Sequence, residues 1–324
     1  MQNRIWRRLA LCAAGLAMTA AAQGADYPTR AITMIVPFPP AGVADIVARP
    51  VAEALSRELG QSVVIENRPG AGGGLGIGQA ARAQPDGYTL LMSLSSISIL
   101  PAADRVLARE PAYRLDQFVP IARVTADPTV LAVRADAPWQ SVEDFLADAG
   151  KRPKQINYGS SGVYGTMHLP MEMLAHDAGV ELMHIPFTGG GPAVQALLGG
   201  QVDVLATGPS TVLQLIEAGR VRVLAHWGDE PLASLPDVPS LRSLGHDVGF
   251  RQWSGLFAIE GTPEPVVQRL RDAMAKVAQD ERLNRTISAT GSPVAYLDAQ
   301  AFDEYWKEDT QVLTETVERI GKVD

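Results

Sequence analysis

The fold is decided by the stretch Ile32-Thr-Met-Ile-Val-Pro-Phe-Pro-Pro-Ala-Gly-Val-Ala-Asp-Ile-Val-Ala-Arg49. Its apolar run, Ile32–Val36, predicts a buried strand, and the proline- and glycine-rich elbow at 37–42 ends that strand. Apolar residues spaced from Ile46 to Leu55 then predict an amphipathic helix. Ligands of α/β folds commonly bind at such an elbow, because the first turn of a helix leaves N–H groups unpaired and carries a partial positive charge. An ordinary connection between a strand and a helix has the same pattern.

The same strand–loop–helix pattern recurs twice further along the chain. Two more predicted strands end in glycine-containing loops, 158–168 and 186–193, and helices are expected to follow at 163–178 and 193–199. This alternation of strands and helices predicts an α/β fold. If the loop at 37–45 belongs to one lobe and the other two loops to a second lobe, all three face one cleft. Their unpaired N–H groups would then form a receptor for a carboxylate.

The first 25 residues have the pattern of a secretory signal peptide. Basic residues precede an apolar run, Leu9–Ala22, which is too short to span a bilayer. We therefore expect a signal peptide at 1–25 and a protein exported to the periplasm. Cys12 is the single cysteine of the chain and lies in this segment, so the mature protein should contain no disulfide and no cysteine-based metal site.

Length and charge limit the class of protein. The chain has 324 residues, and the roughly 300 that follow a signal peptide are more than one hydrophobic core usually serves. We expect two lobes joined by crossing strands, the first of residues 26–126 plus 252–324 and the second of residues 127–251. The net charge of −8 argues against nucleic acid or an anionic membrane as partner. A small anion can still bind locally at helix N-termini.

The glycine-rich run and the histidines match no motif for nucleotide or metal binding. The run Asn67-Arg-Pro-Gly-Ala-Gly-Gly-Gly-Leu-Gly-Ile-Gly78 fits neither the G-x-G-x-x-G dinucleotide pattern nor a phosphate loop. Close approach of its backbone to a neighbouring element explains it better, with a helix pattern only at 80–83. The histidines show no metal-binding spacing, so no metal and no other cofactor is expected. Gly159-Ser-Ser-Gly162 does not fit the G-x-S-x-G pattern of α/β-hydrolases.

Nine stretches of the sequence form an ordered set, namely Val36–Arg49, Glu66–Gly73, Pro85–Leu91, Tyr158–Gly162, His168-Leu169, His184–Ala193, Gly200–Asp203, Leu235–Pro239 and Trp253–Ala258. Taken together and in this order, they resemble the Bug or TctC family of bacterial periplasmic solute receptors. The resemblance implies the type II periplasmic binding protein fold, which is α/β with two lobes, mixed sheets and hinge strands between the lobes. It also implies a non-catalytic receptor that captures a small organic carboxylate for a tripartite tricarboxylate-type membrane transporter or a sensor, and we expect a monomer.

The resemblance also implies where the ligand binds. In the family, the loops that correspond to 38–45 and 160–168 hold a ligand carboxylate between them, and the loop at 187–190 lies beside them. Glycine in the first loop suits close approach of a ligand to the backbone. The candidate ligand-binding residues are Phe38, Pro40, Ala41, Gly42, Val43, Asp45, Ser160, Ser161, Gly162, Tyr164, Gly165, Thr166, His168, Phe187, Thr188 and Gly189.

Several of these residues allow a second role. Asp45 either caps its own helix or meets an ammonium or hydroxyl group of the ligand. Ser161 and Thr166 are expected to contact the ligand, although hydroxyl groups at helix starts are often caps. Tyr164 either points into the cleft or turns outward, and His168 either orients its loop or is a buried structural histidine.

The sequence departs from the family pattern at the proposed site. The family usually has Gly-Gly in place of Ala41-Gly42, Thr or Ser in place of Ala44, and Gly-Ser in place of Tyr164-Gly165. The ligand therefore need not be one that is typical of the family. Phe38 and Phe187 either form apolar walls of the site or pack in the core.

Two other functions fit parts of the sequence. A periplasmic hydrolase acting on a carboxylate ester would use Ser161 and His168, although no sequence motif pairs them as nucleophile and base. The effector domain of a transcription regulator has a similar fold. The predicted signal peptide and the lack of a DNA-binding segment argue against that second alternative.

Overall fold

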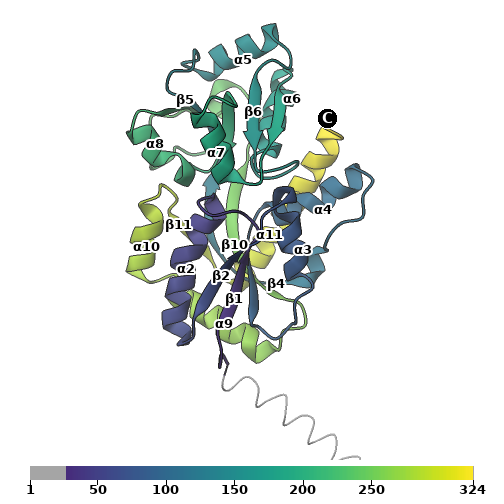
Figure 1. Cartoon of the computed structure of the whole chain (residues 1–324), viewed down its shortest axis with the longest axis vertical. Helices are drawn as coiled ribbons and strands as arrows, with labels where there is room; N and C mark the ends of the chain where they lie inside the picture. Colours follow the sequence, from purple (N-terminus) through teal and green to yellow (C-terminus); the bar gives the residue numbers. More distant parts are fainter. Residues whose placement is uncertain (1–26, 324) are drawn as a thin grey trace, which may run out of the picture.

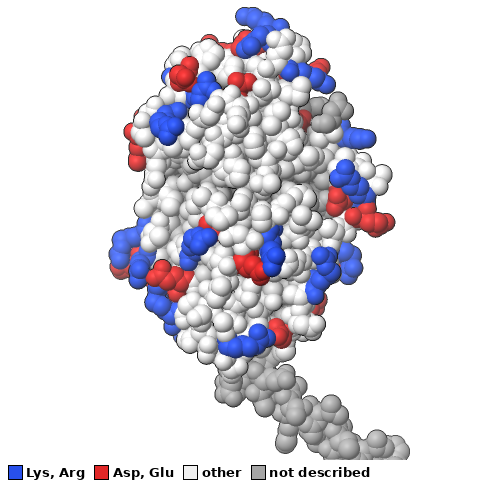
Figure 2. Space-filling model, in the orientation of Figure 1, with Lys and Arg blue, Asp and Glu red and all other residues white. Residues whose placement is uncertain are grey.

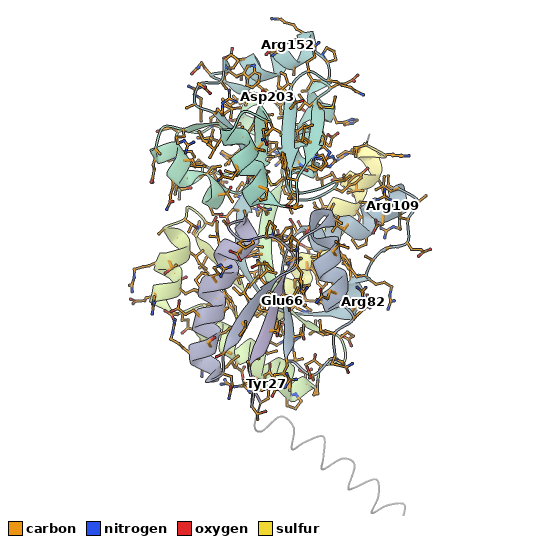
Figure 3. All side chains as sticks on the ribbon, in the orientation of Figure 1. Tyr27, Glu66, Arg82, Arg109, Arg152 and Asp203 are labelled. Carbon is orange, nitrogen blue, oxygen red and sulfur yellow. The ribbon has the colours of Figure 1, made fainter. Side chains whose placement is uncertain are left out.

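The computed structural model of the chain describes residues 27–323, so the predicted signal peptide lies outside the described residues. Two sheets, each covered by helices, form two lobes that are stacked along the long axis of the molecule (Figure 1). Tyr27 lies at the end of lobe 1 that is farthest from lobe 2 (Figure 3). No helix within residues 27–323 combines the length and the apolarity needed to cross a membrane.

Lobe 1 is built on a six-stranded sheet in the order β11-β4-β10-β3-β1-β2. Its first strand, β1, is parallel to both of its neighbours, whereas β10 and β11 run antiparallel to β4. Its strands are β1 (Ile32–Val36), β2 (Val63–Asn67), β3 (Thr89–Leu94), β4 (Phe118–Pro128), β10 (Arg251–Ile259) and β11 (Val294–Leu297). Its helices are α2 (Val43–Leu59), α3 (Gly74–Ala80), α4 (Ser96–Val106), α9 (Glu264–Val277), α10 (Glu281–Ser288) and α11 (Ala299–Ile320).

Lobe 2 is built on a five-stranded sheet in the order β7-β6-β8-β5-β9, with β5 antiparallel to both of its neighbours. Its strands are β5 (Val130–Arg134), β6 (Asn157–Ser160), β7 (Met183–Pro186), β8 (Val204–Thr207) and β9 (Val221–His226). Its helices are α5 (Val142–Lys151), α6 (Leu169–Ala178), α7 (Gly190–Leu198) and α8 (Leu213–Glu217). Short 3-10 turns occur at Ala71–Gly73, Leu115–Gln117, Pro209–Thr211 and Arg242–Leu244.

The opening strand forms as its sequence predicts. β1 lies between β2 and β3, and four of its five residues are buried, which explains an apolar run instead of alternation. Helix α2 starts at Val43 with Gly42 as the preceding residue, and it packs its apolar side against α9 and the sheet. The other face of the sheet shares one hydrophobic cluster with lobe 2, in which Trp253 and Phe257 of lobe 1 are joined to Phe145 and Tyr158 of lobe 2. The two lobes therefore share a continuous apolar core.

Two chain crossings and a helix connect the lobes. Strand β4 of lobe 1 runs directly into β5 of lobe 2, and the chain returns in β10, which pairs with β4 along its whole length. The Thr125 and Ser254 hydroxyls are 2.7 Å apart across this pair. Helix α11 packs on α4 and β4 of lobe 1 and also contacts α6 of lobe 2 (Figure 1). The lobes are therefore joined along the side of the molecule where β4, β10 and α11 run.

The structure differs from the sequence prediction at four elements. Helix α6 begins at Leu169 instead of residue 163, because the intervening loop turns through positive φ at Gly162 and Tyr164. The glycine run contains helix α3, which was expected only at 80–83. Helix α4 and strand β11 were not predicted. Mixed sheets, as expected from the family resemblance, are confirmed.

The free energy of unfolding should depend on pH through Asp127, which is buried at the end of β4. Burial raises the pKa of Asp127 to about 7, and it outweighs the Ser292 hydroxyl and the positive charge of Arg251, which both lower the pKa. The folded pKa lies above that of the unfolded chain, so this group's contribution to stability is complete at about pH 4 and below and is lost as pH rises through about 7. We expect the stability of Asp127→Asn relative to the wild type to increase by about 2–3 kcal/mol between pH 5 and pH 8.5.

Chemical denaturation of both proteins at the two pH values measures this difference. If the two proteins differ in free energy of unfolding by the same amount at both pH values, the pKa of Asp127 is not raised in the folded protein. The asparagine amide also loses solvent on folding, but this cost does not vary with pH and cancels from the comparison.

Candidate functional site

A small cavity lies between the lobes, where the predicted loops meet. Its volume is about 10 Å³, which is the space that one water molecule needs. The two lobes are therefore closed on each other in this structure. Within residues 27–323, no charged side chain lines this cavity. The lining residues are Phe38, Gly42, Val43 and Leu94 of lobe 1, Gln252 of the crossing strand β10, and Ser161, Thr166, Met167, Gly190 and Thr207 of lobe 2.

Two helices from opposite lobes begin at this cavity. In α2 the first helical hydrogen bond runs from the Ile46 N–H to the Gly42 carbonyl, and in α7 the corresponding bond is from Ala193 to Gly189. The N–H groups before these bonds have no partner inside their helix. A Cβ placed on Gly42 would lie 3.9 Å from the Gly190 nitrogen, so the helix starts are adjacent. Two positive helix ends that face each other repel, and an anion between them removes that repulsion.

Close contacts of glycine backbone join the lobes on either side of the cavity. A Cβ on Gly162 of lobe 2 would lie 2.6 Å from the Gly72 nitrogen of lobe 1. A Cβ on Gly189 of lobe 2 would lie 2.2 Å from Cδ of Pro39. Neither position has room for a side chain while the lobes are closed. The glycine run at 67–78 thus makes the close backbone contact that its composition predicted, and the structure shows that the contact is with lobe 2.

Of the predicted residues, the structure brings five to the cavity lining, namely Phe38, Gly42, Val43, Ser161 and Thr166. Five lining residues were not predicted, namely Leu94, Met167, Gly190, Thr207 and Gln252. The predicted residues that do not line it in the closed structure are Pro40, Ala41, Asp45, Ser160, Gly162, Tyr164, Gly165, His168, Phe187, Thr188 and Gly189.

Asp45 holds the elbow of the first loop in place. Its carboxylate accepts a hydrogen bond from the Ala41 N–H at 3.1 Å and from Asn67 at 2.9 Å, and it pairs with both Arg49 donors at 2.8 Å. Asn67 also donates to the Phe38 carbonyl at 2.9 Å. Burial acts to raise the pKa of Asp45, but the hydrogen bonds from Arg49, Asn67 and Ala41 outweigh it and lower the pKa. Asp45 therefore holds the elbow before α2, where Ala41 has a φ of +64°, although α2 itself has no side-chain cap hydrogen bond.

Tyr164 points toward the C-terminal segment in the closed structure. Its hydroxyl donates to the Gly321 carbonyl at 2.5 Å and accepts from the Val323 N–H at 3.2 Å. The ring is almost fully buried, although the backbone of Tyr164 has a positive φ of +53°. The end of the chain that follows α11 is thereby attached to the loop of lobe 2.

His168 is fully buried behind that loop. Its Nδ1 accepts a hydrogen bond from the Tyr164 N–H at 3.1 Å, which supports the loop from inside. Burial, followed by the electrostatic effect of His184, whose ring is tilted at 55° to that of His168 with 4.2 Å between the ring centres, holds the pKa of His168 well below its usual range. The histidine is thus neutral at physiological pH. Within the described chain, Ser161 Oγ has no hydrogen-bond partner, so these two residues are not paired as nucleophile and base.

The serine that contacts a histidine in this loop is Ser160 and not Ser161. Its hydroxyl lies 2.6 Å from Nε2 of His184 and also accepts from the Gly162 N–H at 3.0 Å. Ser160 is fully buried, and burial lowers the pKa of His184 to about 4. These bonds hold the turn at Gly162, which brings Ser161 to the cavity. Phe187 and Thr188, the predicted third loop, lie outside the lining, with Phe187 partly buried and Thr188 exposed.

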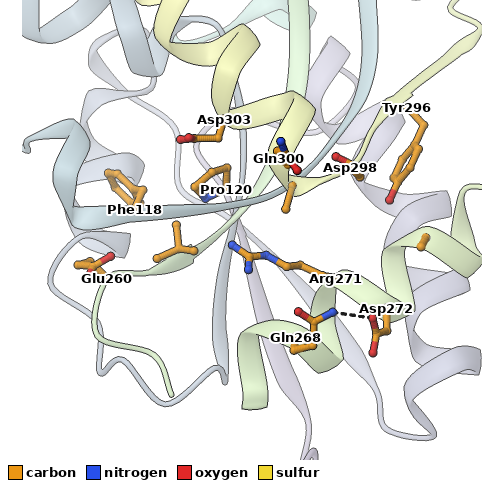
Figure 4. Close-up of a pocket in the computed structure, with 13 residues that line it drawn as sticks. Phe118, Pro120, Glu260, Gln268, Arg271, Asp272, Tyr296, Asp298, Gln300 and Asp303 are labelled. Atoms are coloured by element: carbon orange, nitrogen blue, oxygen red, sulfur yellow. Dashed lines mark hydrogen bonds between the residues drawn. The ribbon is translucent and has the colours of Figure 1, made fainter. Parts of the chain in front are cut away.

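A larger groove, of about 650 Å³, lies on lobe 1 and shares no residue with the predicted site. Arg271 reaches across it beside Gln268 and Asp272, whose side chains are hydrogen-bonded at 2.8 Å (Figure 4). The face in Figure 2 carries scattered charges of both signs without a large patch of one sign. Within residues 27–323, no group of three or more His, Cys, Asp or Glu side chains is placed to hold a metal ion.

Comparison with known sequences identifies the family. Residues 47–322 match the family described as "Tripartite tricarboxylate transporter family receptor". A UPF0065 protein of Pseudomonas sp. strain P51 is similar, with 33% identity over 314 residues that cover 95% of this chain and 92% of that protein. BugT of Bordetella pertussis is 32% identical over 289 residues, which cover 87% of this chain and 86% of that protein.

Solved structures agree with this result. The periplasmic binding protein BugD superimposes with a TM-score of 0.85 at 32% identity, covering 91% of this chain and 99% of that one. MatC of Rhodopseudomonas palustris, solved with bound malate, superimposes with a TM-score of 0.83 at 29% identity, covering 90% of this chain and 99% of that one. Another R. palustris protein, solved with adipate, superimposes with a TM-score of 0.85 at 28% identity, covering 91% of this chain and 98% of that one. The fold class and family expected from the sequence are confirmed, and the chain belongs to the Bug/TctC family of tripartite tricarboxylate transporter receptors.

Proposed function

We propose that this protein captures a small organic carboxylate in the cavity between its lobes and presents it to a membrane transporter of the tripartite type. The observation that supports this most is the meeting of two helix starts, those of α2 and α7, at one buried and uncharged cavity. An anion is the ligand that such an arrangement favours, because several N–H groups and two positive helix ends converge on it.

The relatives support the same chemistry. MatC was solved with malate and its R. palustris relative with adipate, and both ligands are carboxylates. Capture for transport takes place outside the cytoplasmic membrane, so we propose that the predicted signal peptide directs the protein to the periplasm. Opening and closing of the lobes around the crossing strands would admit and hold the ligand.

A test of carboxylate capture uses matched pairs of compounds. A panel of mono- and dicarboxylates is compared with the corresponding primary amides, which have the same shape and no charge. We expect at least one acid to raise the thermal unfolding midpoint and to bind measurably by calorimetry, because a ligand of the folded state stabilises it. Its amide should bind at least about tenfold more weakly, since it loses charge-assisted hydrogen bonds. An amide that binds as well as its acid would contradict an anion site.

The same preparation separates a receptor from the alternative hydrolase. Carboxylate esters are incubated with the wild type and with Ser161→Ala, and products are followed by chromatography. A receptor leaves the esters unchanged. Turnover that disappears in Ser161→Ala would identify an enzyme. Thr211→Ala serves as the control, because it removes a hydroxyl that is bonded to Thr207 and lies outside the lining.

A further inference from the structure

The C-terminal helix, α11, is anchored to lobe 1 and ends at lobe 2. On α11, Trp306 donates from Nε1 to the hydroxyl of Ser98 on α4 at 2.9 Å. Asp309 of the same helix accepts from Nε1 of Trp253 on β10 at 2.7 Å. The far end of α11 lies beside α6 of lobe 2 (Figure 1). The segment that follows the helix, Gly321–Val323, therefore reaches from one lobe to the other.

The hydroxyl of Tyr164 holds this segment with two hydrogen bonds. It donates to the Gly321 carbonyl at 2.5 Å and accepts from the Val323 N–H at 3.2 Å. Tyr164 belongs to lobe 2 and lies in the loop between β6 and α6. Ser161 and Thr166 of the same loop line the cavity. The end of the chain is thus bonded, across the boundary between the lobes, to a loop of the proposed site.

The backbone at Tyr164 is unfavourable for a tyrosine. Its φ of +53° lies in the left-handed region, where a Cβ atom crowds the following carbonyl oxygen and only glycine is unstrained. A side chain stays in such a conformation when its surroundings hold it there. Here the residue is 1% exposed, its N–H donates to Nδ1 of His168 at 3.1 Å, and its hydroxyl makes both bonds to the C-terminal segment. These contacts offset the strain.

The loop around Tyr164 rests on lobe 1 in the closed structure. A Cβ on Gly162 would lie 2.6 Å from the nitrogen of Gly72 in lobe 1. On the other side of Tyr164, the Cα of Gly165 lies 3.5 Å from the place that a Cβ on Gly72 would take. Tyr164 lies between these two contacts, so its position relative to lobe 1 depends on closure.

We propose that Gly321–Val323 is a latch, which the Tyr164 hydroxyl binds when the lobes close and releases when they open. The loop between β6 and α6 moves with lobe 2, whereas α11 stays with lobe 1, so opening breaks both bonds. The latch stabilises the closed form and slows the release of a captured acid. This inference rests on the proposed function and adds a control of the residence time that lies outside the cavity.

The first experiment measures closure without any ligand. The described residues contain no cysteine, so cysteines introduced at Gln79 of lobe 1 and Ala147 of lobe 2, both exposed, can carry a pair of spin labels. Pulsed electron spin resonance then gives the populations of open and closed molecules. Tyr164→Phe keeps the ring and removes the hydroxyl. We expect it to raise the ratio of open to closed molecules about 5–30-fold, which is the effect of losing two hydrogen bonds. Deletion of residues 321–324 should have the same effect.

Two further variants show whether the contact itself is responsible. Tyr164→Phe in the shortened chain should change the ratio by no more than about twofold, because both alterations remove the same bonds. Tyr113→Phe is the matched control, since the Tyr113 hydroxyl is also buried and donates to a backbone carbonyl, that of Ile97, at 2.9 Å, but within lobe 1. It should leave the ratio of open to closed molecules at the wild-type value.

The second experiment measures release. The probes are malate and adipate, with which two of the similar proteins were solved. Fluorophores replace the spin labels, and dissociation of each acid is followed by stopped flow. Tyr164→Phe should release a bound acid about 5–30-fold faster than the wild type and should not bind it more slowly.

An unchanged ratio of open to closed molecules in Tyr164→Phe would overturn the inference. An equal rise in Tyr113→Phe would overturn it as well, because a general loss of stability then explains the result. Additive effects of the deletion and Tyr164→Phe, or an unchanged release rate of a bound acid, would also contradict a latch. If the ratio responds as expected but neither these acids nor any other carboxylate of the panel binds, the latch is supported and the proposed function fails.

Discussion

Replacing Gly162 by alanine is expected to weaken ligand binding by about 100-fold or more, because the lobes can no longer close. The added methyl group would lie 2.6 Å from the Gly72 nitrogen, which is backbone and cannot move aside alone. The ligand then contacts one lobe and loses the hydrogen bonds of the other. Calorimetry with a bound acid gives the affinity, and small-angle scattering shows whether the ligand still makes the molecule more compact.

Gly179→Ala is the matched control for Gly162→Ala. Gly179 also lies in lobe 2 and has a positive φ of +63°, so alanine is strained there too, although less than at Gly162, whose φ is +126°. No atom lies within 4 Å of its would-be methyl group, so closure is unaffected and the affinity should stay at the wild-type value. Full affinity in Gly162→Ala would rule out a site that depends on closure.

A second pair of variants tests the other side of the cavity. At Gly42 a single methyl group fits, since its nearest neighbour would be 3.7 Å away and the φ of −88° suits any residue. Gly42→Ala should therefore bind nearly normally, whereas the branched side chain of Gly42→Val extends to the start of α7 and obstructs the ligand. Equal affinity of these two variants would contradict the placement of the ligand between the helix starts.

The largest loss of stability should come from Asp45→Ala, which we expect to cost about 2–4 kcal/mol in the free energy of unfolding. The substitution leaves the Ala41 N–H and the Asn67 amide without their acceptor. The elbow is then free to leave its positive φ, so binding should weaken as well. Denaturant unfolding gives the stability, and calorimetry gives the affinity of the same preparation.

Two controls distinguish the buried hydrogen bonds of Asp45 from its ion pair with Arg49 at the surface. Arg49→Ala removes the partly exposed partner of Asp45 and should cost at most about 1 kcal/mol. Asp45 has a lowered pKa in the folded protein, so the stability that it contributes is present above its unfolded pKa and is lost as the pH falls through its folded pKa. The difference between the wild type and Asp45→Asn should therefore shrink in acid. If Asp45 contributed only through its ion pair with Arg49, Asp45→Ala would lower the free energy of unfolding by no more than Arg49→Ala does.

The sequence predicts the parts of this fold that depend on local pattern. The run Ile32–Val36, the elbow and the helix after Gly42 occur where apolar spacing and glycine place them. The glycine composition of 67–78 correctly indicated close backbone contact, although it did not indicate that the contact is with the other lobe. Helix α4 was missed because Ser96-Ile-Ser-Ile alternates polar and apolar residues as a strand does, and here every one of these residues is buried.

The site was predictable only in part, because its remaining residues are brought together by the tertiary fold. Gln252 lies next to Arg251 at the start of β10, and nothing local marks it as a lining residue. Thr207 and Leu94 lie at strand ends that reach the cavity only when both sheets are assembled. Tyr164 allowed two orientations, and the choice depends on Gly321, which is 157 positions away in the chain. Sequence spacing carries no signal for such a contact.

The attachment of the chain end to Tyr164 has a practical consequence for recombinant work. The segment Gly321–Val323 lies on the loop that follows β6, since both of its ends bond to the Tyr164 hydroxyl, so a bulky fusion at the C-terminus is expected to disturb that loop. Tyr27 lies at the far end of lobe 1 (Figure 3), so the N-terminal side is the better place for a tag.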